Sequence, residues 1–536
     1  MKLAVSRDAN TGISSVGGSA ERLRHLIIVL GDQLSRDSAA FDGFDTETDA
    51  VMMCESTNEA TCVPQHRQRL VLFFSAMRHF RADLAADQKA VFYSALDDVE
   101  NVGSLAGEVE RRVRQGQPER LIVLHPGDYR VLDSLKRVAC SLGVPLEIRP
   151  DRHFIDTIEG FARYAGRQKS LRLETYYRGL RKRHGILMNS ARPVGDRWNF
   201  DADNRKALPK GQQLEFPSPL RFAPDAITRT VMSLVQARFP DAPGRLDSFQ
   251  HPVSARDAAY VLDDFIAHRL PRFGQYQDAM AVGEPHLFHS LLSTSLNLHL
   301  LDPRDAIKAA VSVCTTGHVP LNSVEGFVRQ VLGWREYIRG IYWWQMPGYA
   351  EFNALGAVLP MPAFMWTGET QMNCVRECIG QLNAHGYAHH IQRLMVLGLF
   401  AMLLGVNPNE VHRWHMSMNI DAVDWVSLPN VIGMSQYADG GIVGSKPYCA
   451  SGNYINKMSD YCKNCRYEPR RAAGEGACPF STLYWDFLDR HSERLRLNGR
   501  MTFQLRHLAR KSNGEMRAIR AKAANLKTDY ATNTLS

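Results

Sequence analysis

The spacing of hydrophobic and polar positions changes once along this chain of 536 residues, close to residue 254. Before that point, short apolar runs alternate with longer amphipathic segments. The apolar runs predict β-strands at residues 26–30, 50–53, 90–93, 120–124 and 146–148. The amphipathic segments predict helices at residues 67–84, 104–114 and 130–142. Strands and helices that alternate at this spacing indicate βαβ units and a parallel sheet.

Polar residues follow several of the predicted strands. Asp32 and Gln33 come after the first strand, and Glu55 and Glu59 follow the second. Because open parallel sheets bind ligands at the carboxyl ends of their strands, these side chains are candidates for a ligand site. No glycine-rich phosphate fingerprint is present, which argues against a classical dinucleotide site.

Beyond residue 254 the apolar residues keep a helical spacing almost throughout. The predicted helices cover residues 257–265, 287–299, 324–342, 372–385 and 384–400. Residues 193–243 are proline-rich and predicted to be irregular. The pattern of residues 494–527 predicts one basic helix. This helix could contact a nucleic acid, but we favour a solvated terminus. The pattern therefore predicts an α/β domain followed by an all-helical one.

Composition and charge refine this division. We predict a disordered tail at 1–24, an α/β domain at 25–155, a basic interdomain linker at 156–250, a helical domain at 251–500 and a basic C-terminal tail at 501–536. The chain has no apolar run of 18 residues, and its start lacks the apolar core of a secretory signal. We therefore expect a cytoplasmic protein with no membrane partner.

The chain has a net charge of +8, and part of its positive charge lies in the linker. Between residues 161 and 200, arginines and lysines interleave with Tyr164, Tyr176 and Tyr177. Such a run is usually a solvated face. Basic and aromatic residues together can instead contact phosphates and stack on bases, which would suit a nucleic acid.

Cysteine spacing is the strongest single signal. Cys462 and Cys465 form a C-x-x-C pair, and Cys478 follows with a proline after it. Three clustered thiols need a fourth ligand to close a metal site, and either Cys374 or Cys378 could supply it. The spacing alone does not choose between these two, nor between an iron–sulfur cluster and zinc.

Two adjacent histidines, His389 and His390, precede an apolar helical face. A histidine pair in a pocket can hold or deliver one proton, although one could equally be a core residue and the other solvated. The segment from Tyr387 to Arg393, Tyr-Ala-His-His-Ile-Gln-Arg, resembles the active-site motif of (6-4) photolyases. The resemblance runs from about residue 26 to about residue 497. It is strongest to the iron–sulfur bacterial cryptochromes and photolyases.

This resemblance implies a Rossmann-like parallel-sheet antenna domain and an all-helical domain that binds FAD and a [4Fe–4S] cluster. It implies His389 and His390 as catalytic residues. The implied FAD contacts are Ser290, Ser293, Arg329, Gln330, Arg393, Asp421 and Asn430. The implied cluster ligands are Cys374, Cys462, Cys465 and Cys478. We also expect Arg393 to pair with a nearby carboxylate.

Two further sets of residues match the family. Asp32 and Glu59 correspond to contacts of an antenna pigment, 6,7-dimethyl-8-ribityllumazine. The residues that correspond to electron carriers toward the flavin are Trp366, Trp414 and Tyr454. The sequence departs from its relatives at three positions. Cys62 and His415 stand where some relatives have Tyr, and Ser427 stands where relatives have Glu.

The resemblance implies light-dependent repair of pyrimidine–pyrimidone (6-4) photoproducts in DNA by a monomer. A photon-excited reduced flavin would give the lesion an electron, and His390, assisted by His389, would supply a proton. Two other classes stay open. One is a cryptochrome-type blue-light photosensor with the same cofactors, and the other is a nucleic-acid-binding iron–sulfur module resembling primase large subunits.

Overall fold

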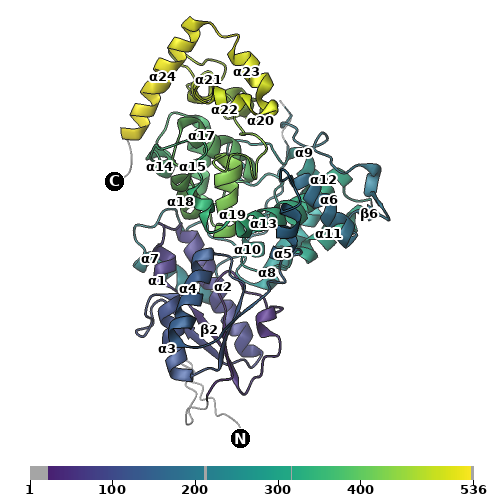
Figure 1. The fold of residues 1–536 in the computed structure, drawn as a ribbon, viewed down its shortest axis with the longest axis vertical. Helices are drawn as coiled ribbons and strands as arrows, with labels where there is room; N and C mark the ends of the chain where they lie inside the picture. Colours follow the sequence, from purple (N-terminus) through teal and green to yellow (C-terminus); the bar gives the residue numbers. More distant parts are fainter. Residues whose placement is uncertain (1–21, 210–213, 316, 533–536) are drawn as a thin grey trace. The chain divides into compact units, whose positions relative to one another are not determined.

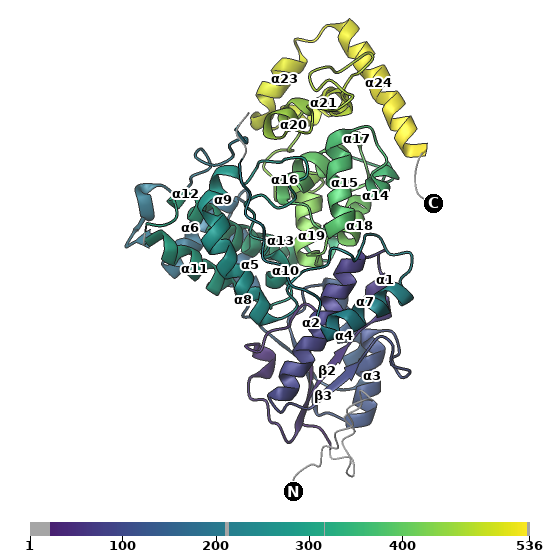
Figure 2. The same cartoon turned by 180° about the vertical axis from the view of Figure 1, so that it is seen from behind.

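The computed structural model describes residues 22–209, 214–315 and 317–532, which form two compact units (Figures 1 and 2). The N-terminal unit comprises the described residues of Met1–Thr157, Leu220–Asp263 and Leu291–Ala306. The C-terminal unit comprises those of Ile158–Pro219, Asp264–Ser290 and Ile307–Ser536. Most of the predicted tail at 1–24 lies outside the described residues.

A five-stranded parallel sheet, in the order β3-β2-β1-β4-β5, forms the core of the N-terminal unit. Its strands are β1 (His25–Ile28), β2 (Asp49–Cys54), β3 (Val91–Ser94), β4 (Arg120–Leu124) and β5 (Leu146–Arg149). The helices between them are α1 (Thr57–Thr61), α2 (Arg67–Ala86), α3 (Leu105–Gly116) and α4 (Tyr129–Leu142). The predicted strands, helices and parallel sheet are therefore confirmed.

Alternation along the strands explains how the sheet is covered. Leu26 and Ile28 point to one face, where they join a buried cluster with Val109 of α3 and Leu135 of α4. In register, Ile27 lies beside Val51 of β2 on one side and beside Ile122 of β4 on the other. The strand order reverses at β1, which is the position where open sheets of this kind bind ligands.

Two later segments of the chain belong to the N-terminal unit. They carry α7 (Ala226–Arg238), α8 (Ala255–Asp264) and α10 (Ser293–Asn297). Helix α7 packs on α2 and buries Val231 and Val235, one helical turn apart. The prediction that residues 193–243 are irregular throughout is therefore wrong, because an amphipathic helix lies between the prolines.

The predicted helix at 287–299 is also wrong in extent, since only α10 is helical. Leu287, Leu291 and His299 adopt left-handed backbone angles, with φ of 45°, 59° and 62°. Such angles cannot continue an α-helix. The apolar side chains of this segment are nevertheless buried, which is why its sequence resembles a helix face.

The C-terminal unit is helical, apart from a short antiparallel pair, β6 (Met188–Asn189) and β7 (Arg192–Pro193). Its first helices are α5 (Ile158–Ala165), α6 (Leu173–His184), α9 (Leu270–Tyr276), α12 (Leu321–Val328) and α13 (Glu336–Gln345); α11 (Pro303–Thr315) begins in the N-terminal unit. The middle helices are α14 (Phe364–Thr367), α15 (Asn373–His385), α16 (His390–Gln392), α17 (Leu399–Leu404), α18 (Pro408–Met418) and α19 (Asp424–Pro429). The last are α20 (Gly452–Met458), α21 (Pro479–Arg490), α22 (Ser492–Arg496), α23 (Thr502–Leu508) and α24 (Asn513–Thr532). The predicted all-helical domain is thus confirmed.

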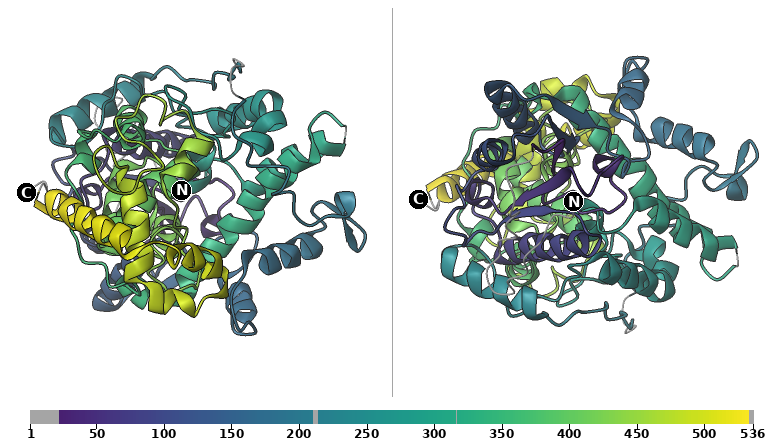
Figure 3. Two further views of the ribbon diagram at one scale, coloured as in Figure 1. Left: turned by 90° about the horizontal axis from the view of Figure 1, so that it is seen from above. Right: turned by 90° about the horizontal axis from the view of Figure 1, so that it is seen from below.

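The C-terminal basic segment is not one solvated helix, as predicted, but three helices. The last of these, α24, packs on α21 and buries Met516, Ile519 and Leu526. It is the long yellow helix that leads to the C-terminus in Figure 3. Lys527 of α24 also pairs with Asp486 of α21 at 2.6 Å. Other basic residues of this packed helix, such as Arg517 and Arg520, are exposed. In the described ranges, no helix is both long and apolar enough to cross a membrane.

Candidate functional site

The two predicted catalytic histidines lie at a break between helices. Helix α15 ends at His385, and Gly386 closes it with φ of 60°, a left-handed conformation that favours glycine. The chain becomes helical again at His390, with His389 as the N-cap residue. The prediction of one continuous helix over 384–400 is therefore wrong. We refer to residues 386–390 as the histidine loop.

His389 is buried, with 3% of its surface exposed, and its ring stacks on that of His289 with centroids 4.4 Å apart. Burial lowers the pKa of His389 well below its usual value, and the nearby His289 and His390 lower it further. His390 keeps an exposed side chain. The pKa of His390 is lowered to about 4, mainly because the surrounding protein removes water from the imidazole and further because of the charge of Arg393. Both shifts favour the neutral imidazole in the free protein.

The sequence indicates His289 only as part of a flavin-contacting segment. Its Nδ1 lies 3.0 Å from the carbonyl oxygen of His286, and its Nε2 lies 3.0 Å from that of Gln277. A neutral imidazole can donate to only one of these oxygens. The stack on His389 thus brings a third histidine to the site, one that chain-local patterns do not connect with the pair.

Arg393 braces the histidine loop. Its Nη1 and Nη2 donate to the two carboxylate oxygens of Asp421 at 2.9 and 3.2 Å, and its Nε donates to the carbonyl of Ala388 at 2.5 Å. The expected pairing of Arg393 with a nearby carboxylate is confirmed. Bidentate pairs of this kind fix orientation as well as charge. The charge of Arg393 also acts on buried His415, whose pKa is lowered to about 3, mainly by burial.

Three residues predicted to contact FAD begin wide π-helical turns. These turns cover Arg329–Arg335, Arg393–Gly398 and Asn430–Ser435. Such turns are rare and are frequently found at functional sites. Their polar side chains, together with the carboxylate of Asp421, offer both donors and acceptors, as the polar edge of a flavin requires. The residues present therefore fit a flavin chemically.

Some of the predicted flavin contacts are engaged within their own helices. Arg329 is buried and pairs with Glu325 at 2.9 Å and with Asp201 at 2.7 Å. Gln330 and Asn430 each donate to a carbonyl one turn earlier, at 3.0 and 2.8 Å. Among the residues that the structure describes, no hydrogen bond joins these three side chains to the histidine loop. Their part in a cofactor site remains a prediction.

The segment with the predicted serines is divided between the two units. Ser290 ends a stretch of the C-terminal unit, while Ser293 is the first residue of α10 in the N-terminal unit. Helix α10 has only five residues, so it provides little dipole for a phosphate. The role of both serines in binding a diphosphate remains a prediction.

Of the predicted electron carriers, Trp414 is the most buried, with 1% exposed. Its indole N–H donates to the carbonyl of Met365 at 2.9 Å, so it lies beside the backbone next to Trp366. Its ring also meets that of His415 edge-on, at 4.9 Å between centroids. Tyr454 is half-buried, and burial raises its pKa. The structure therefore brings Trp414 close to the Trp366 segment, while Tyr454 belongs to the separate helix α20.

The four predicted cluster ligands gather in the C-terminal unit. Cys374 lies in the first turn of α15, Cys478 caps α21, and Cys462 and Cys465 lie in the loop before it. Burial raises the pKa of Cys374 well above its usual value, and Cys478, Cys378, Cys462 and Cys465 add to the effect in that order.

The cysteine spacing left two questions open: whether Cys374 or Cys378 is the fourth ligand, and whether the site binds zinc or an iron–sulfur cluster. The thiol of Cys378 instead interacts with the side chain of Tyr461, which favours Cys374 as the fourth member. Within the described ranges, no three His, Cys, Asp or Glu side chains are spaced to hold a metal ion. One zinc ion would require thiolates about 3.7 Å apart, given zinc–sulfur bonds of about 2.3 Å in a tetrahedron. Cys374 and Cys478 are buried, whereas Cys462 and Cys465 are half-buried, and the kind of metal at this site remains a prediction.

In the N-terminal unit, the predicted pigment residues lie at the carboxyl ends of the strands. Glu59 of α1 pairs with Arg130 of α4 at 3.1 Å, and Arg130 also pairs with Asp128. Asp32 follows β1, and its pKa is raised to about 7 by burial, with Asp151 and Asp128 adding to the rise. A carboxyl group that is readily protonated can donate a hydrogen bond to a ligand.

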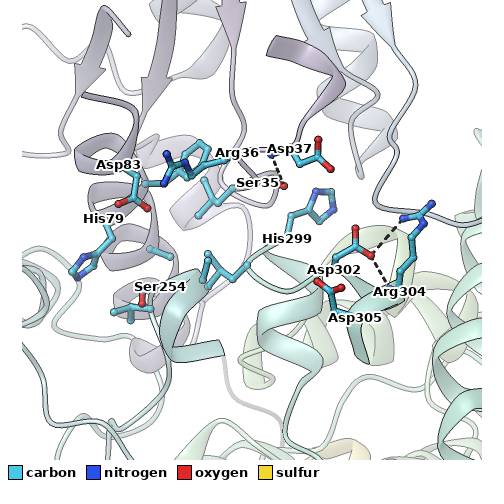
Figure 4. Close-up of a pocket in the computed structure, with 16 residues that line it drawn as sticks. Ser35, Arg36, Asp37, His79, Asp83, Ser254, His299, Asp302, Arg304 and Asp305 are labelled. Carbon is cyan, nitrogen blue, oxygen red and sulfur yellow. Dashed lines mark hydrogen bonds and ion pairs between the residues drawn. The ribbon is translucent and has the colours of Figure 1, made fainter. Parts of the chain in front are cut away.

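A separate cavity of about 380 Å³ opens in the same unit (Figure 4). Its lining includes Ser35, His79, His299 and Asp302, and it contains neither Asp32 nor Glu59. Its lining carries both acidic and basic side chains, and Nη1 of Arg304 donates to a carboxylate oxygen of Asp302 at 3.5 Å. The cavity is therefore distinct from the predicted pigment site.

A parallel α/β unit followed by a helical unit is the architecture of photolyases and cryptochromes. Residues 27–251 match the family described as deoxyribodipyrimidine photo-lyase-related protein. A (6-4) photolyase from Agrobacterium fabrum is 47% identical over 502 residues, which cover 94% of this chain and 99% of the relative. The chain therefore belongs to the photolyase and cryptochrome family, and membership implies FAD as a cofactor.

Solved structures agree on the fold. A bacterial class III photolyase from Agrobacterium tumefaciens superposes with a TM-score of 0.54 at 15% identity, covering 96% of this chain and all of that one. A cryptochrome from Synechocystis sp. PCC6803 superposes with a TM-score of 0.50 at 14% identity, covering 83% and 90% of the two chains. The predicted photolyase architecture is confirmed.

Proposed function

We propose that this chain is a light-dependent DNA repair enzyme that reverses pyrimidine–pyrimidone (6-4) photoproducts. The observation that carries the proposal is the histidine loop, in which His389 and His390 lie beside the buried pair of Arg393 and Asp421. The relative that is 47% identical over nearly its whole length is named a (6-4) photolyase, which supports the same activity. The flavin, when bound, supplies an electron to the lesion on excitation by light.

The chain's own part in this chemistry is to bind the lesion, orient it and handle a proton. His390 has the exposed side chain of the pair and would protonate the heteroatom that moves back between the two bases. Its pKa of about 4 in the free protein means that substrate binding must raise it. Anionic phosphates of the damaged DNA favour the charged imidazole and would supply that shift. His389 is buried and precedes His390 in the chain, and it would orient its neighbour.

The remaining cofactor assignments form part of the proposal. FAD would be held by Ser290, Ser293, Arg329, Gln330, Arg393, Asp421 and Asn430. A [4Fe–4S] cluster would be bound by Cys374, Cys462, Cys465 and Cys478, which is supported by their mutual effect on pKa. A ribityllumazine antenna would be bound by Asp32 and Glu59, at the strand ends where open sheets bind ligands. Trp366, Trp414 and Tyr454 would carry electrons to the flavin.

Damaged DNA is the partner that the proposal requires. In the linker, Arg178, Arg181 and Lys182 surround the ring of Trp198, with charged groups 5.2–5.4 Å from its centroid. Arg178 and Lys182 are exposed and would suit a phosphate backbone, whereas Arg181 is fully buried and serves the packing of this segment. We propose further that the protein acts as a monomer in the cytoplasm, at the nucleoid.

The experiment that tests the proposal compares His390→Ala with His507→Ala, a control on α23. Each variant is reduced, illuminated with a duplex that carries one (6-4) lesion, and assayed for lesion loss by chromatography. General acid catalysis contributes roughly 10²–10⁴-fold, so His390→Ala should lose at least about 100-fold in rate while keeping its FAD. His507→Ala should repair normally. Substantial repair by His390→Ala would contradict the assignment of the acid.

A photosensor is the alternative, favoured by the likeness of the fold to a solved cryptochrome. If the unmodified protein binds FAD and photoreduces it but repairs nothing, that alternative replaces the present proposal. A primase-like iron–sulfur module is not supported, because the similarity to the Agrobacterium fabrum relative extends over 94% of the chain.

A further inference from the structure

Gln392, two residues after His390, is almost fully buried, with 1% of its surface exposed, and its amide uses every hydrogen bond that it can make. Its Oε1 accepts from the backbone N–H of His389 at 2.9 Å and from Nε2 of Gln381 at 3.2 Å. Its Nε2 donates to Oε1 of Gln381 at 2.8 Å and to the hydroxyl of Tyr461 at 3.0 Å. Because the backbone N–H can only donate, the orientation of this amide is determined by its surroundings.

Gln381 of α15 adds a second attachment to the histidine loop. Its Nε2 donates to the carbonyl of Tyr387 at 2.9 Å, in addition to its contact with Gln392. The loop backbone is thus held at Tyr387 and at His389, on either side of Ala388, whose carbonyl binds Arg393. The residues between Gly386 and His389 make no helical hydrogen bonds of their own, so these side-chain contacts define the loop's path.

Tyr461 connects this network to the cysteine-bearing segments. It is 1% exposed and directly precedes Cys462. Its carbonyl accepts from the side chain of Asn373 at 2.8 Å, and Asn373 directly precedes Cys374. Its side chain also interacts with the thiol of Cys378. Tyr461 is therefore anchored to both chain segments that supply the proposed cluster ligands.

We propose that Gln381, Gln392 and Tyr461 are positioning residues. Together they form a hydrogen-bonded network, here called the glutamine bridge, that fixes the position of the proposed catalytic histidines relative to the cysteine site. The inference rests on the proposed function for its catalytic consequence, but the bridge itself is defined by geometry. Small misplacements of catalytic groups can lower rates by about 100-fold. A buried polar network that loses one member leaves its partners unsatisfied, so one hydroxyl is enough to loosen the loop.

The test is Tyr461→Phe, which removes only the hydroxyl, with Tyr437→Phe as the matched control. Tyr437 is also buried in the C-terminal unit, and its hydroxyl accepts from the side chain of Asn498 at 3.5 Å. Amide hydrogen exchange of the peptide that covers the histidine loop is measured by mass spectrometry. Exchange in that peptide should become about tenfold faster in Tyr461→Phe, which corresponds to about 1.4 kcal/mol. It should be unchanged in Tyr437→Phe.

Repair provides the second readout. With pre-reduced protein, the single-turnover rate of lesion loss should fall at least fivefold in Tyr461→Phe, while lesion affinity, FAD content and iron content match the unmodified protein. If Tyr461→Phe does not fold, Gln381→Met is judged by the same criteria. The proposed bridge would be overturned by amide exchange in the loop peptide equal to that of the unmodified protein. Faster exchange spread over the whole unit would overturn it as well.

The two readouts separate the inference from the proposed function. If the unmodified protein repairs nothing, the proposed function fails, and exchange alone still decides whether the bridge exists. If exchange accelerates while the repair rate of an active protein stays unchanged, the bridge exists but does not position the catalytic groups, and the inference is overturned.

Discussion

Replacing Asp421 with Asn should destabilise the C-terminal unit far more than the loss of a similar ion pair at the surface. The carboxylate of Asp421 is 9% exposed and its partner Arg393 is 22% exposed. Removing one member of a buried pair typically costs about 3–5 kcal/mol, because the other charge is left uncompensated. Since Arg393 keeps its bond to the Ala388 carbonyl and some contact with water, we expect about 2–3 kcal/mol.

Asp489→Asn is the matched control. Asp489 also makes a two-point contact with an arginine, Arg520, at 2.7 and 3.0 Å. The two side chains are 26% and 55% exposed, so this pair is worth under about 1 kcal/mol. The two variants therefore differ in burial rather than in the number of hydrogen bonds removed.

The assay is thermal unfolding of the flavin-loaded protein, followed by circular dichroism and by the release of flavin fluorescence. In a unit of this size, 2–3 kcal/mol lowers the melting temperature by on the order of 5 °C, and the control should shift by about 2 °C or less. Scans at one fixed rate keep the comparison valid if unfolding is irreversible. Equal melting temperatures for the two variants would refute the argument that burial makes the Arg393–Asp421 pair important.

Three further predictions concern other parts of the chain. The raised pKa of Asp32, about 7, means that the protonated carboxyl stabilises the N-terminal unit fully below about pH 4 and that this contribution is lost as the pH rises through 7. Asp32→Asn should therefore raise the melting temperature at pH 8 and leave it unchanged near pH 4. Glu59→Ala should release the pigment while FAD stays bound, as absorption spectra of the purified variant would show; loss of both would contradict separate sites. Trp414→Phe should slow photoreduction of oxidised FAD by an external donor without affecting repair by pre-reduced protein, and unchanged photoreduction would mean that electrons travel elsewhere.

The parallel sheet is predictable from the chain because each strand is a short buried apolar run bounded by polar residues. The predicted strand at 120–124 coincides with β4, and the other strands differ by one or two residues at their ends. Segment 287–299 is not predictable, because its buried apolar residues have helical spacing while tertiary packing imposes left-handed angles at Leu287 and Leu291. Burial produces the same residue pattern in both cases, so the pattern alone cannot distinguish them.

The candidate site likewise has a part that the sequence predicts and a part that it does not. The cysteine and histidine motifs are local in sequence, so their spacing alone indicates candidate ligands and a candidate acid. The stack of His289 on His389 joins residues 100 positions apart, and the contact between Gln392 and Tyr461 spans 69 positions. A glutamine two residues after a histidine pair could suggest a polar network, but nothing in the sequence identifies its partner.

Electrostatics explains why the histidine loop requires such firm attachment. The surrounding protein, then Arg393 and then His289 lower the pKa of the His390 imidazole. On the proposed function, a geometry that brings His390 close to the negative charge of bound DNA would favour its protonated form. Because Coulomb interactions fall with distance, a displacement of the loop would weaken that effect. With His390 as the proposed acid, this arrangement would link its protonation to the presence of the substrate, as long as the loop is held where the lesion is proposed to bind.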